Sequence, residues 1–365
     1  MEAELLIENI EKHLPLLSRI LPTHTQVPIL SNILISASKK GVVLKATDLE
    51  IGVEISIPAK INREGAVTVP GKQFIEAIAN LPKDKILISE DKDSVRIVSR
   101  ENKITFQSLS PLEFPELLKS KGVKIFSLEK ERFDKMFEHL AFSASTDDIR
   151  PHLTGIFLAK KEKGLELVTT DGYRLTLKTI KEDAVSNMEE SIIVSVRVVN
   201  EAISIKDDRV DVYINTEKSQ VVFEGGDVVL VGRLIEGKFP DYNRVIPKEK
   251  RTTVVVGREE FVQNARLASV FAKEQSNVVS VSIKDSEMTL SSKTSGVGEG
   301  SFAMDCEKTG EDNKITFNIR YLLDALKNFE GEKITVMLNN AVSPAILEDD
   351  KKTFKHVIMP IKTED

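Results

Sequence analysis

The feature that most constrains the fold of this chain is a pattern that occurs three times along its 365 residues. Each occurrence passes from a β-type run into a helical pattern: VTVPGKQFIEAIANL at 67–81, IIVSVRVVNEAISI at 192–205 and ITFNIRYLLDALKNF at 315–329. Alignment puts a basic residue near the start of each helix, 125 and then 123 residues apart, namely Lys72, Arg197 and Arg320. Such a repeat predicts tandem copies of one structural module.

Two shorter motifs recur at nearly the same spacing. LEFPEL (112–117) and GKFPDY (237–242) come near the ends of the first and second copies. Asp48 and Asp171 follow matching β-type runs and are 123 residues apart. These coincidences indicate that each copy is about 120 residues long.

Each copy also contains an earlier helical pattern, at 6–21, 132–144 and 259–272, with apolar residues every three or four positions. Pro15 interrupts the first pattern, which predicts a kink or a later helix start. Short alternating β-branched runs greatly outnumber these helices. We therefore expect an α+β chain of three tandem modules, each with two helices packed on antiparallel sheets, at residues 1–120, 124–247 and 251–365.

The size of one module limits what an assembly of modules can enclose. A module of this length is roughly 35 Å across. Three touching modules leave a central gap of only about 5 Å, whereas six leave a gap of ~35 Å, which is wide enough for a DNA duplex. A closed head-to-tail dimer of this chain is therefore able to encircle DNA.

Composition narrows the class of protein. The single cysteine, Cys306, excludes an intramolecular disulfide, and the charged N-terminal segment is unlike a signal peptide, so a cytoplasmic protein is expected. No apolar run approaches the roughly 20 residues of a membrane span. The net charge of −6 excludes a surface that is cationic throughout but permits a small basic zone.

Enzyme motifs are absent from the sequence. There is no phosphate-binding loop, no HExxH motif and no cysteine pair for zinc, and GVGEGS (296–301) misses the dinucleotide pattern at its last glycine. The five histidines are scattered singly. We therefore expect neither an enzyme nor a bound cofactor or metal.

A specific resemblance rests on eight motifs that run from end to end of the chain. They are VPIL (27–30), ATDLEIGVE (46–54), VPGKQF (69–74), LSPLEFPEL (109–117), TDGYRL (170–175), EGKFPDYNRVIP (236–247), FNIRYLLDAL (317–326) and VIMPIK (357–362). Together they resemble the bacterial DNA polymerase III beta subunit family, the sliding clamps. The resemblance implies a ring-shaped homodimer of six modules. This ring is a processivity factor that encircles double-stranded DNA after a clamp loader has opened the ring. It also implies tethering of the DNA polymerase III catalytic subunit and other proteins with clamp-binding motifs.

The resemblance assigns three sets of residues. The DNA-facing positions are His24, Lys72, Arg150, Arg197 and Arg320. The peptide-binding pocket comprises Leu153, Thr170, Gly172, Tyr173, Arg174, Leu175, Pro240, Arg244, Val245, Val342, Val357, Met359, Pro360 and Ile361. The dimer surface would pair an edge strand around Ile104 and Phe106 with a helix end around Val270 and Phe271.

Plainer interpretations of the same residues remain open at this stage. Any single Lys or Arg can be a solvated surface charge, TDGYRL can be a plain turn between strands, and Ile104 and Phe106 can face the core of their own module. The whole chain can also be a repeat-built scaffold that binds peptides without encircling DNA. Family departures include Pro151, His152 and Pro344, together with a tail at 363–365 that extends past the usual ending.

Overall fold

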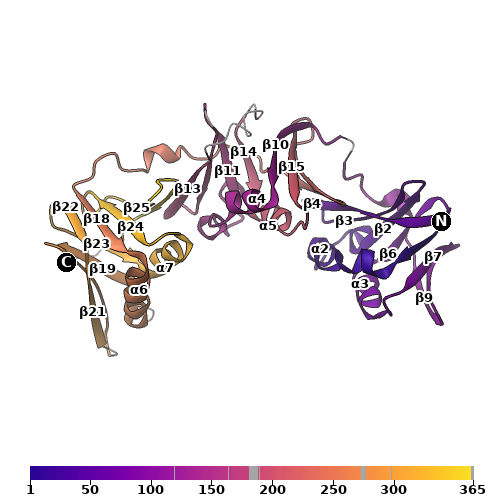
Figure 1. Ribbon diagram of the computed structural model, residues 1–365, viewed down its shortest axis with the longest axis horizontal. Coiled ribbons are helices and arrows are strands. Elements are labelled where there is room, and N and C mark those ends of the chain that lie inside the picture. Colours follow the sequence, from indigo (N-terminus) through magenta and orange to yellow (C-terminus); the bar gives the residue numbers. More distant parts are fainter. Residues whose placement is uncertain are drawn as a thin grey trace. The chain divides into compact units, whose positions relative to one another are not determined.

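The computed structural model describes residues 1–118, 120–162, 164–180, 188, 190–272, 277–296 and 298–362, so the tail at 363–365 lies outside the described residues. The chain forms two compact units (Figure 1). Unit 1 combines Met1–Lys135 with Arg197–Leu234, and unit 2 combines Met136–Val196 with the chain from Ile235 onward. The second predicted module contributes strands to both units.

Unit 1 contains two antiparallel sheets with strand orders β5-β1-β7-β8-β9 and β10-β15-β16-β17-β4-β3-β2-β6. Their strands are β1 (Glu2–Leu6), β2 (Asn32–Ser38), β3 (Gly41–Thr47), β4 (Ile51–Ile57), β5 (Ala59–Arg63), β6 (Gly65–Pro70), β7 (Lys85–Asp91), β8 (Ser94–Ser99), β9 (Asn102–Gln107), β10 (Val123–Glu129), β15 (Arg209–Asn215), β16 (Gln220–Gly225) and β17 (Val228–Arg233).

Unit 2 also contains two antiparallel sheets, with strand orders β14-β11-β12-β13-β26-β25-β24-β18-β22 and β21-β20-β19-β23. Their strands are β11 (Gly155–Lys160), β12 (Leu165–Thr170), β13 (Arg174–Ile180), β14 (Ile192–Ser195), β18 (Thr252–Gly257), β19 (Val278–Lys284), β20 (Glu287–Thr294), β21 (Gly298–Asp305), β22 (Glu307–Gly310), β23 (Asn313–Asn318), β24 (Lys333–Leu338), β25 (Ala345–Asp349) and β26 (Phe354–Ile358).

The described residues form helices in all three copies of the repeat. They are α1 (Ile7–Glu11), α2 (Leu14–Ile20), α3 (Gly71–Asn80), α4 (Lys130–Phe137), α5 (Val196–Ile203), α6 (Arg258–Ala272) and α7 (Ile319–Asn328). Each of α3, α5 and α7 directly follows a strand and buries the predicted apolar face, for example Phe74 and Ile78 in α3. In the third module α6 and α7 pack side by side over one core (Figure 1).

The first helices differ from their predicted spans. Each copy opens on a strand, β1, β10 or β18, before its helix begins. Pro15 is the second residue of α2, where its missing N–H costs no helical hydrogen bond, so the helical pattern divides before it. The predicted helix at 132–144 ends at Phe137, because His139 has a φ of 65°, in the left-handed region that helices do not accommodate.

Strand pairing carries each large sheet across a module boundary. β17 of the second module pairs with β4 of the first, with Val231 opposite Gly52. β26 of the third module pairs with β13 of the second, with Val357 opposite Leu175. The modules are therefore joined by backbone hydrogen bonds at two equivalent places. Among the described residues, no helix is long and apolar enough to cross a membrane.

Candidate functional site

Unit 2 holds a cavity of about 300 Å³ beside the β13–β26 joint. The turn between β12 and β13, the end of β26, the 3-10 turn η4 (Pro151–Leu153) and the segment 240–245 contribute its walls. The lining residues are Arg150, His152, Leu153, Thr170, Gly172, Tyr173, Arg174, Leu175, Pro240, Asp241, Tyr242, Val245, Val357 and Met359.

The turn between β12 and β13 forms one rim of this cavity. Asp171 Oδ1 accepts N–H hydrogen bonds from Tyr173 at 2.9 Å and Arg174 at 3.0 Å. Thr170 Oγ1 donates to the carbonyl of Arg174 at 2.6 Å and accepts the N–H of Gly172 at 3.1 Å. Gly172 has a φ of 94°, where a residue without Cβ is favoured. The Thr-Asp-Gly sequence therefore shapes the turn and leaves the Tyr173 side chain exposed at the rim.

The floor of the cavity is apolar. Leu175 and Val357 lie opposite each other in the β13–β26 pair, and both are buried. The N–H of Met359 donates to the carbonyl of Tyr173 at 2.9 Å, which holds the chain beyond β26 against the turn. Met359 is 39% exposed, so a flexible thioether lies at the cavity mouth. This combination suits apolar side chains of varied shape.

Tyr242 is fixed beneath the same cavity by its hydroxyl group. The phenol donates to Glu166 Oε2 at 2.6 Å, and the Lys161 ammonium lies 5.6 Å from the ring centre. Burial, helped by the hydrogen bond to Glu166, raises the pKa of Tyr242 above its ordinary value. The hydroxyl therefore stays neutral and engaged away from any ligand.

Most residues that the resemblance assigned to a pocket line this cavity together. These are Leu153, Thr170, Gly172, Tyr173, Arg174, Leu175, Pro240, Val245, Val357 and Met359. Their convergence includes residues from β13 and β26 that are far apart in the sequence. A pocket assembled in this way depends on the joint between the second and third modules.

Four assigned residues lie outside the cavity lining: Arg244, Val342, Pro360 and Ile361. The Arg244 side chain is 85% exposed and pairs with Asp241 at 2.9 Å. Val342 is exposed on the loop before β25. The N–H of Ile361 donates to the carbonyl of Thr316 at 2.8 Å, which attaches this segment to β23.

Four other lining residues were not assigned to the pocket: Arg150, His152, Asp241 and Tyr242. The sequence offered a signal for Asp241 and Tyr242, because both belong to the repeated GKFPDY motif. Arg150, which the resemblance assigns to DNA, also lines the cavity, and its Nη2 donates to the carbonyl of Asp171 at 3.4 Å. Its guanidinium group therefore belongs to the surroundings of the turn.

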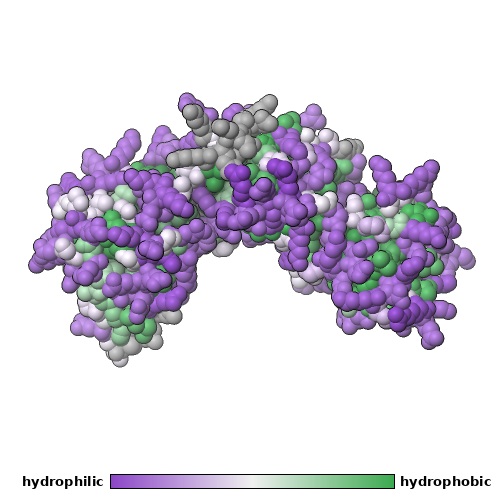
Figure 2. Space-filling model, in the orientation of Figure 1, coloured by the Kyte–Doolittle hydropathy of each residue, from purple (hydrophilic) through white to green (hydrophobic). Residues whose placement is uncertain are grey.

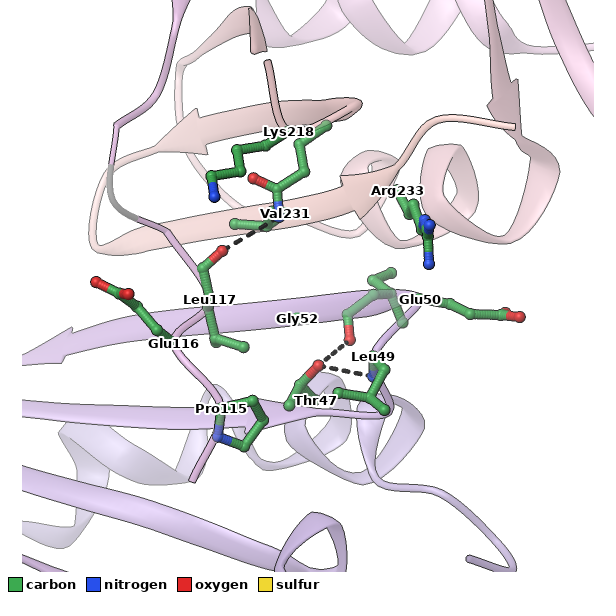
Figure 3. Close-up of a pocket in the computed structure, with 12 residues that line it drawn as sticks. Thr47, Leu49, Glu50, Gly52, Pro115, Glu116, Leu117, Lys218, Val231 and Arg233 are labelled. Atoms are coloured by element: carbon green, nitrogen blue, oxygen red, sulfur yellow. Dashed lines mark hydrogen bonds between the residues drawn. The ribbon is translucent and has the colours of Figure 1, made fainter. Parts of the chain in front are cut away.

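Unit 1 contains a cavity of about 210 Å³ built on the same backbone plan (Figure 3). Asp48 Oδ1 accepts N–H hydrogen bonds from Glu50 at 3.0 Å and Ile51 at 2.9 Å, as Asp171 does in the second copy. The N–H of Arg233 donates to the carbonyl of Glu50 at 2.8 Å, as Met359 does to Tyr173. Both cavities therefore lie beside equivalent strand joints.

The side chains of the first cavity are different. Gly52 stands where Leu175 stands in the second, and Figure 3 shows the Leu117 side chain reaching toward Gly52. A Cβ on Gly52 would lie 3.1 Å from Leu117 Cδ2, so Leu117 fills that space. At the rim, Glu50 and Arg233 replace Tyr173 and Met359. The apolar cavity of unit 2 is therefore the stronger candidate for an apolar ligand.

The three aligned basic residues are each the second residue of a helix. Lys72, Arg197 and Arg320 lie in the first turns of α3, α5 and α7, and all three residues are exposed. Arg197 is ion-paired with Asp48, and its Nη2 also donates to the carbonyl of Arg19 at 3.3 Å. The helix of Arg320 is capped by Asn318, which accepts the Arg320 N–H at 2.9 Å. His24 is exposed in the segment between α2 and β2.

The residues assigned to a dimer surface lie on the edge strand β9 and near the end of helix α6. Ile104 and Phe106 share one face of β9, the last strand of its sheet, and both are partly exposed. Val270 is 62% exposed near the end of α6, and the ring of Phe271 stacks on Phe302 of β21 at 6.4 Å. Figure 2 shows apolar residues gathered where Figure 1 draws β21 and the end of α6.

Among the described residues, one group offers metal-ligand spacing: Glu138, His139 and Glu330. Their ligand atoms lie within 4.8 Å of one another, but both glutamates are exposed. Lys178 donates to the carbonyl of Glu138 at 3.3 Å, and the two carboxylates attract its ammonium group. The Lys178 ammonium already offsets part of their charge, and the exposed glutamates give no support for a metal.

Comparison with known proteins places the chain in a family. Residues 1–118, 127–241 and 243–362 match the N-terminal, central and C-terminal domains of the DNA polymerase III beta subunit. The chain belongs to this family. The Beta sliding clamp of Synechococcus elongatus is 30% identical over 361 residues, covering 96% of each chain. That of Staphylococcus aureus strain Mu50 is 30% identical over 355 residues, covering 93% of each.

Solved structures of sliding clamps have the same fold. The DNA polymerase sliding clamp from Bacillus subtilis superposes with a TM-score of 0.94 at 26% identity, and the beta subunit from Thermotoga maritima with 0.89 at 28%, each covering 100% of both chains. The predicted family and the three-module α+β fold are confirmed. Sliding clamps are non-catalytic processivity factors, so family membership also confirms that the chain is not an enzyme and supports the sliding clamp over the repeat-built scaffold.

Proposed function

We propose that two copies of this chain close head to tail into a ring of six modules that encircles double-stranded DNA, independent of sequence, in the cytoplasm. A clamp loader opens and closes the ring on DNA. The unit 2 cavity then tethers the DNA polymerase III catalytic subunit, and in turn other proteins that carry clamp-binding motifs. The ring keeps its clients on the template by enclosure.

One observation carries this proposal: the chain contains three sets of joining strands and uses only two of them internally. β17 pairs with β4, and β26 pairs with β13, in antiparallel register. The corresponding strands of the remaining set are β9 and β21, which end their sheets. Among the described residues, neither has a partner strand on its outer side. An unpaired edge presents backbone N–H and C=O groups, which a second copy can satisfy.

Few phosphate contacts suit a protein that must move along DNA. Each neutralised phosphate adds sequence-independent affinity. It also makes the slope of log K against log salt concentration more negative by about 0.9. Lys72 and Arg320 are exposed at helix starts, whereas Arg197 is already paired with Asp48. With a net charge of −6, adhesion is weak and topology supplies retention.

Disulfide trapping of the third joint tests the ring. Aligning the hairpins at Thr47, Thr170 and Lys293, which pair with Gly52, Leu175 and Glu299, extends the register of the two internal joints. In those joints Gly52 faces Val231 and Leu175 faces Val357. The same register places Thr105 of β9 opposite Glu299 of β21 in the partner. Both side chains are exposed, so cysteines at these positions can form a bond between copies.

The expected product of a Thr105→Cys/Glu299→Cys variant after oxidation is a doubly linked dimer on a denaturing gel. When the bonds form on nicked circular DNA, protein and DNA should stay together in high salt and detergent. Each single-cysteine variant serves as the control for random linkage through exposed thiols. A double variant that is dimeric in solution yet links no better than these controls contradicts the proposed joint.

A further inference from the structure

Arg174 lies in the lining of the unit 2 cavity, but its guanidinium group is bound by other residues of unit 2. Its side chain is only 10% exposed. Nε donates to Asp171 Oδ2 at 3.0 Å, Nη1 to Asp324 Oδ2 at 2.9 Å, and Nη2 to the carbonyl of Phe142 at 2.7 Å. Three of the five N–H donors of the group are therefore engaged within the protein.

Two aromatic rings complete the surroundings of this group. The guanidinium carbon lies 4.5 Å from the ring centre of Tyr321 and 5.6 Å from that of Phe142. Tyr321 and Asp324 both belong to α7, the helix that has Arg320 in its first turn. The ring of Tyr173 at the cavity rim also stacks on Tyr321, at 6.5 Å. The turn is thus attached to α7 by an ion pair and by stacked rings.

The first copy of the module shows that the turn itself does not need an arginine. Ile51 stands at the position of Arg174. There too the aspartate, Asp48, accepts the Ile51 N–H, and the Thr47 hydroxyl donates to the Ile51 carbonyl. The ion pair of Arg174 with α7 must therefore serve something other than formation of the turn.

The acidic residue on the second helix is present at both joints, but its partner differs. Glu201 of α5 is equivalent to Asp324, since the two are 123 residues apart, and it binds Arg19 of α2 at 2.8 Å. Arg19 is in turn equivalent to Phe142. Only at the joint with the apolar cavity does the arginine come from the cavity turn. The link to the helix is therefore specific to the candidate binding site.

We propose that Arg174 is the positioning residue of the peptide pocket: it fixes the rim at Tyr173 against α7 through Asp324 and makes no contact with the bound peptide. This inference deepens the proposed function and rests on it. A rim that is already ordered before binding loses less conformational entropy when the peptide arrives. Loss of the Arg174–Asp324 pair should therefore weaken the peptide complex even though neither group touches the peptide.

The test is a double-mutant cycle on the full-length chain. The probe is a fluorescein-labelled synthetic peptide containing the clamp-contacting segment of the polymerase from the same organism. The variants are Arg174→Lys, which keeps the charge but loses the planar fork, Asp324→Asn, and the two combined. Arg19→Lys is the matched control, because it alters the equivalent ion pair at the other joint.

Each single variant should weaken peptide binding about tenfold, which corresponds to about 1.4 kcal/mol. The double variant should bind the peptide no more weakly than the more affected of the two single variants, because both changes break the same Arg174–Asp324 ion pair. The Arg19→Lys variant should bind as tightly as the unaltered chain. Losses that add in the double variant would mean direct contact between Arg174 and the peptide, and would overturn the inference.

Asp324 is 40% exposed on its helix, so Asp324→Asn should fold and allow the peptide affinity to be measured even if Arg174→Lys fails to fold. Unchanged peptide affinity in Asp324→Asn would also overturn the inference. The failure of the proposed function looks different. In that case the unaltered chain binds no peptide, or binds it with an affinity that Met359→Ala leaves unchanged.

Discussion

Acidification should destabilise unit 2 through one buried histidine. His356 of β26 has no exposed surface, and its ring packs on Phe142 with 5.3 Å between ring centres. Nδ1 lies 2.8 Å from Thr176 Oγ1, while Nε2 has no hydrogen-bond partner among the described residues. Burial, together with the nearby positive charge of Arg174, lowers the pKa of His356 to about 3. The folded chain therefore holds this imidazole neutral.

The sign and size of the effect follow from linkage. The unfolded imidazole has a pKa near 6.5, so between about pH 6.5 and pH 3 the unfolded chain binds a proton that the folded chain does not. The contribution of His356 to the free energy of unfolding is constant above pH 6.5 and falls as the pH is lowered from there toward pH 3. Between pH 6.5 and 4.5 the loss from His356 alone is about 2 kcal/mol.

The assay is pulse proteolysis in urea across this pH range, comparing the unaltered chain with His356→Gln. Glutamine retains an amide that can hydrogen-bond to Thr176 but does not titrate, so the other ionisable groups cancel in the difference. The advantage of the unaltered chain over the variant should shrink by about 2 kcal/mol from pH 6.5 to 4.5. A difference that stays level across the range would refute the buried neutral histidine.

Three further predictions concern the proposed surfaces. Met359→Ala should weaken binding of the labelled peptide about tenfold in fluorescence anisotropy, because apolar contact at the cavity mouth is lost. Leu112→Ala, exposed in unit 1, should leave the affinity unchanged, and equal losses in the two variants would mean that the peptide binds elsewhere. Asp48→Asn keeps the Oδ1 acceptor of its turn but removes the charge that holds Arg197. The slope of log K against log salt for a short duplex should then steepen by about 0.9, and an unaltered slope would count against a phosphate contact. Phe106→Glu should convert the dimer to a monomer in light scattering while Lys103→Glu leaves it dimeric, and a dimeric Phe106→Glu chain would exclude β9 from the joint.

The repeat was readable from the sequence because it combines helix periodicity with constant offsets. The three strand-to-helix units and their basic second residues appear where the pattern predicts, since their apolar positions are set by local burial. The opening strands were missed because β1 has only five residues and passes directly into α1, so its short alternation merges with the helical pattern. His139 ends α4 through its own backbone conformation, which no periodicity reports.

The candidate site was predictable where it lies in a motif and obscure where it depends on distant partners. Leu175 and Met359 belong to motifs that the resemblance identifies, and both line the cavity. The role of Arg174 depends on Asp324, 150 residues further along the chain, and on the ring of Tyr321. Spacing within a motif cannot show such a contact, so the motif placed Arg174 only in the lining of the peptide-binding pocket.

The most direct measurement of enclosure is retention of labelled protein on DNA before and after the circle is cut. The clamp is loaded onto nicked circular DNA and separated from free protein by gel filtration, and half of the sample is then linearised with a restriction enzyme. Protein should stay with the circle and leave the linear molecule by sliding off its ends. Equal retention on both forms, or equal loss from both, would contradict a ring that holds the duplex by topology.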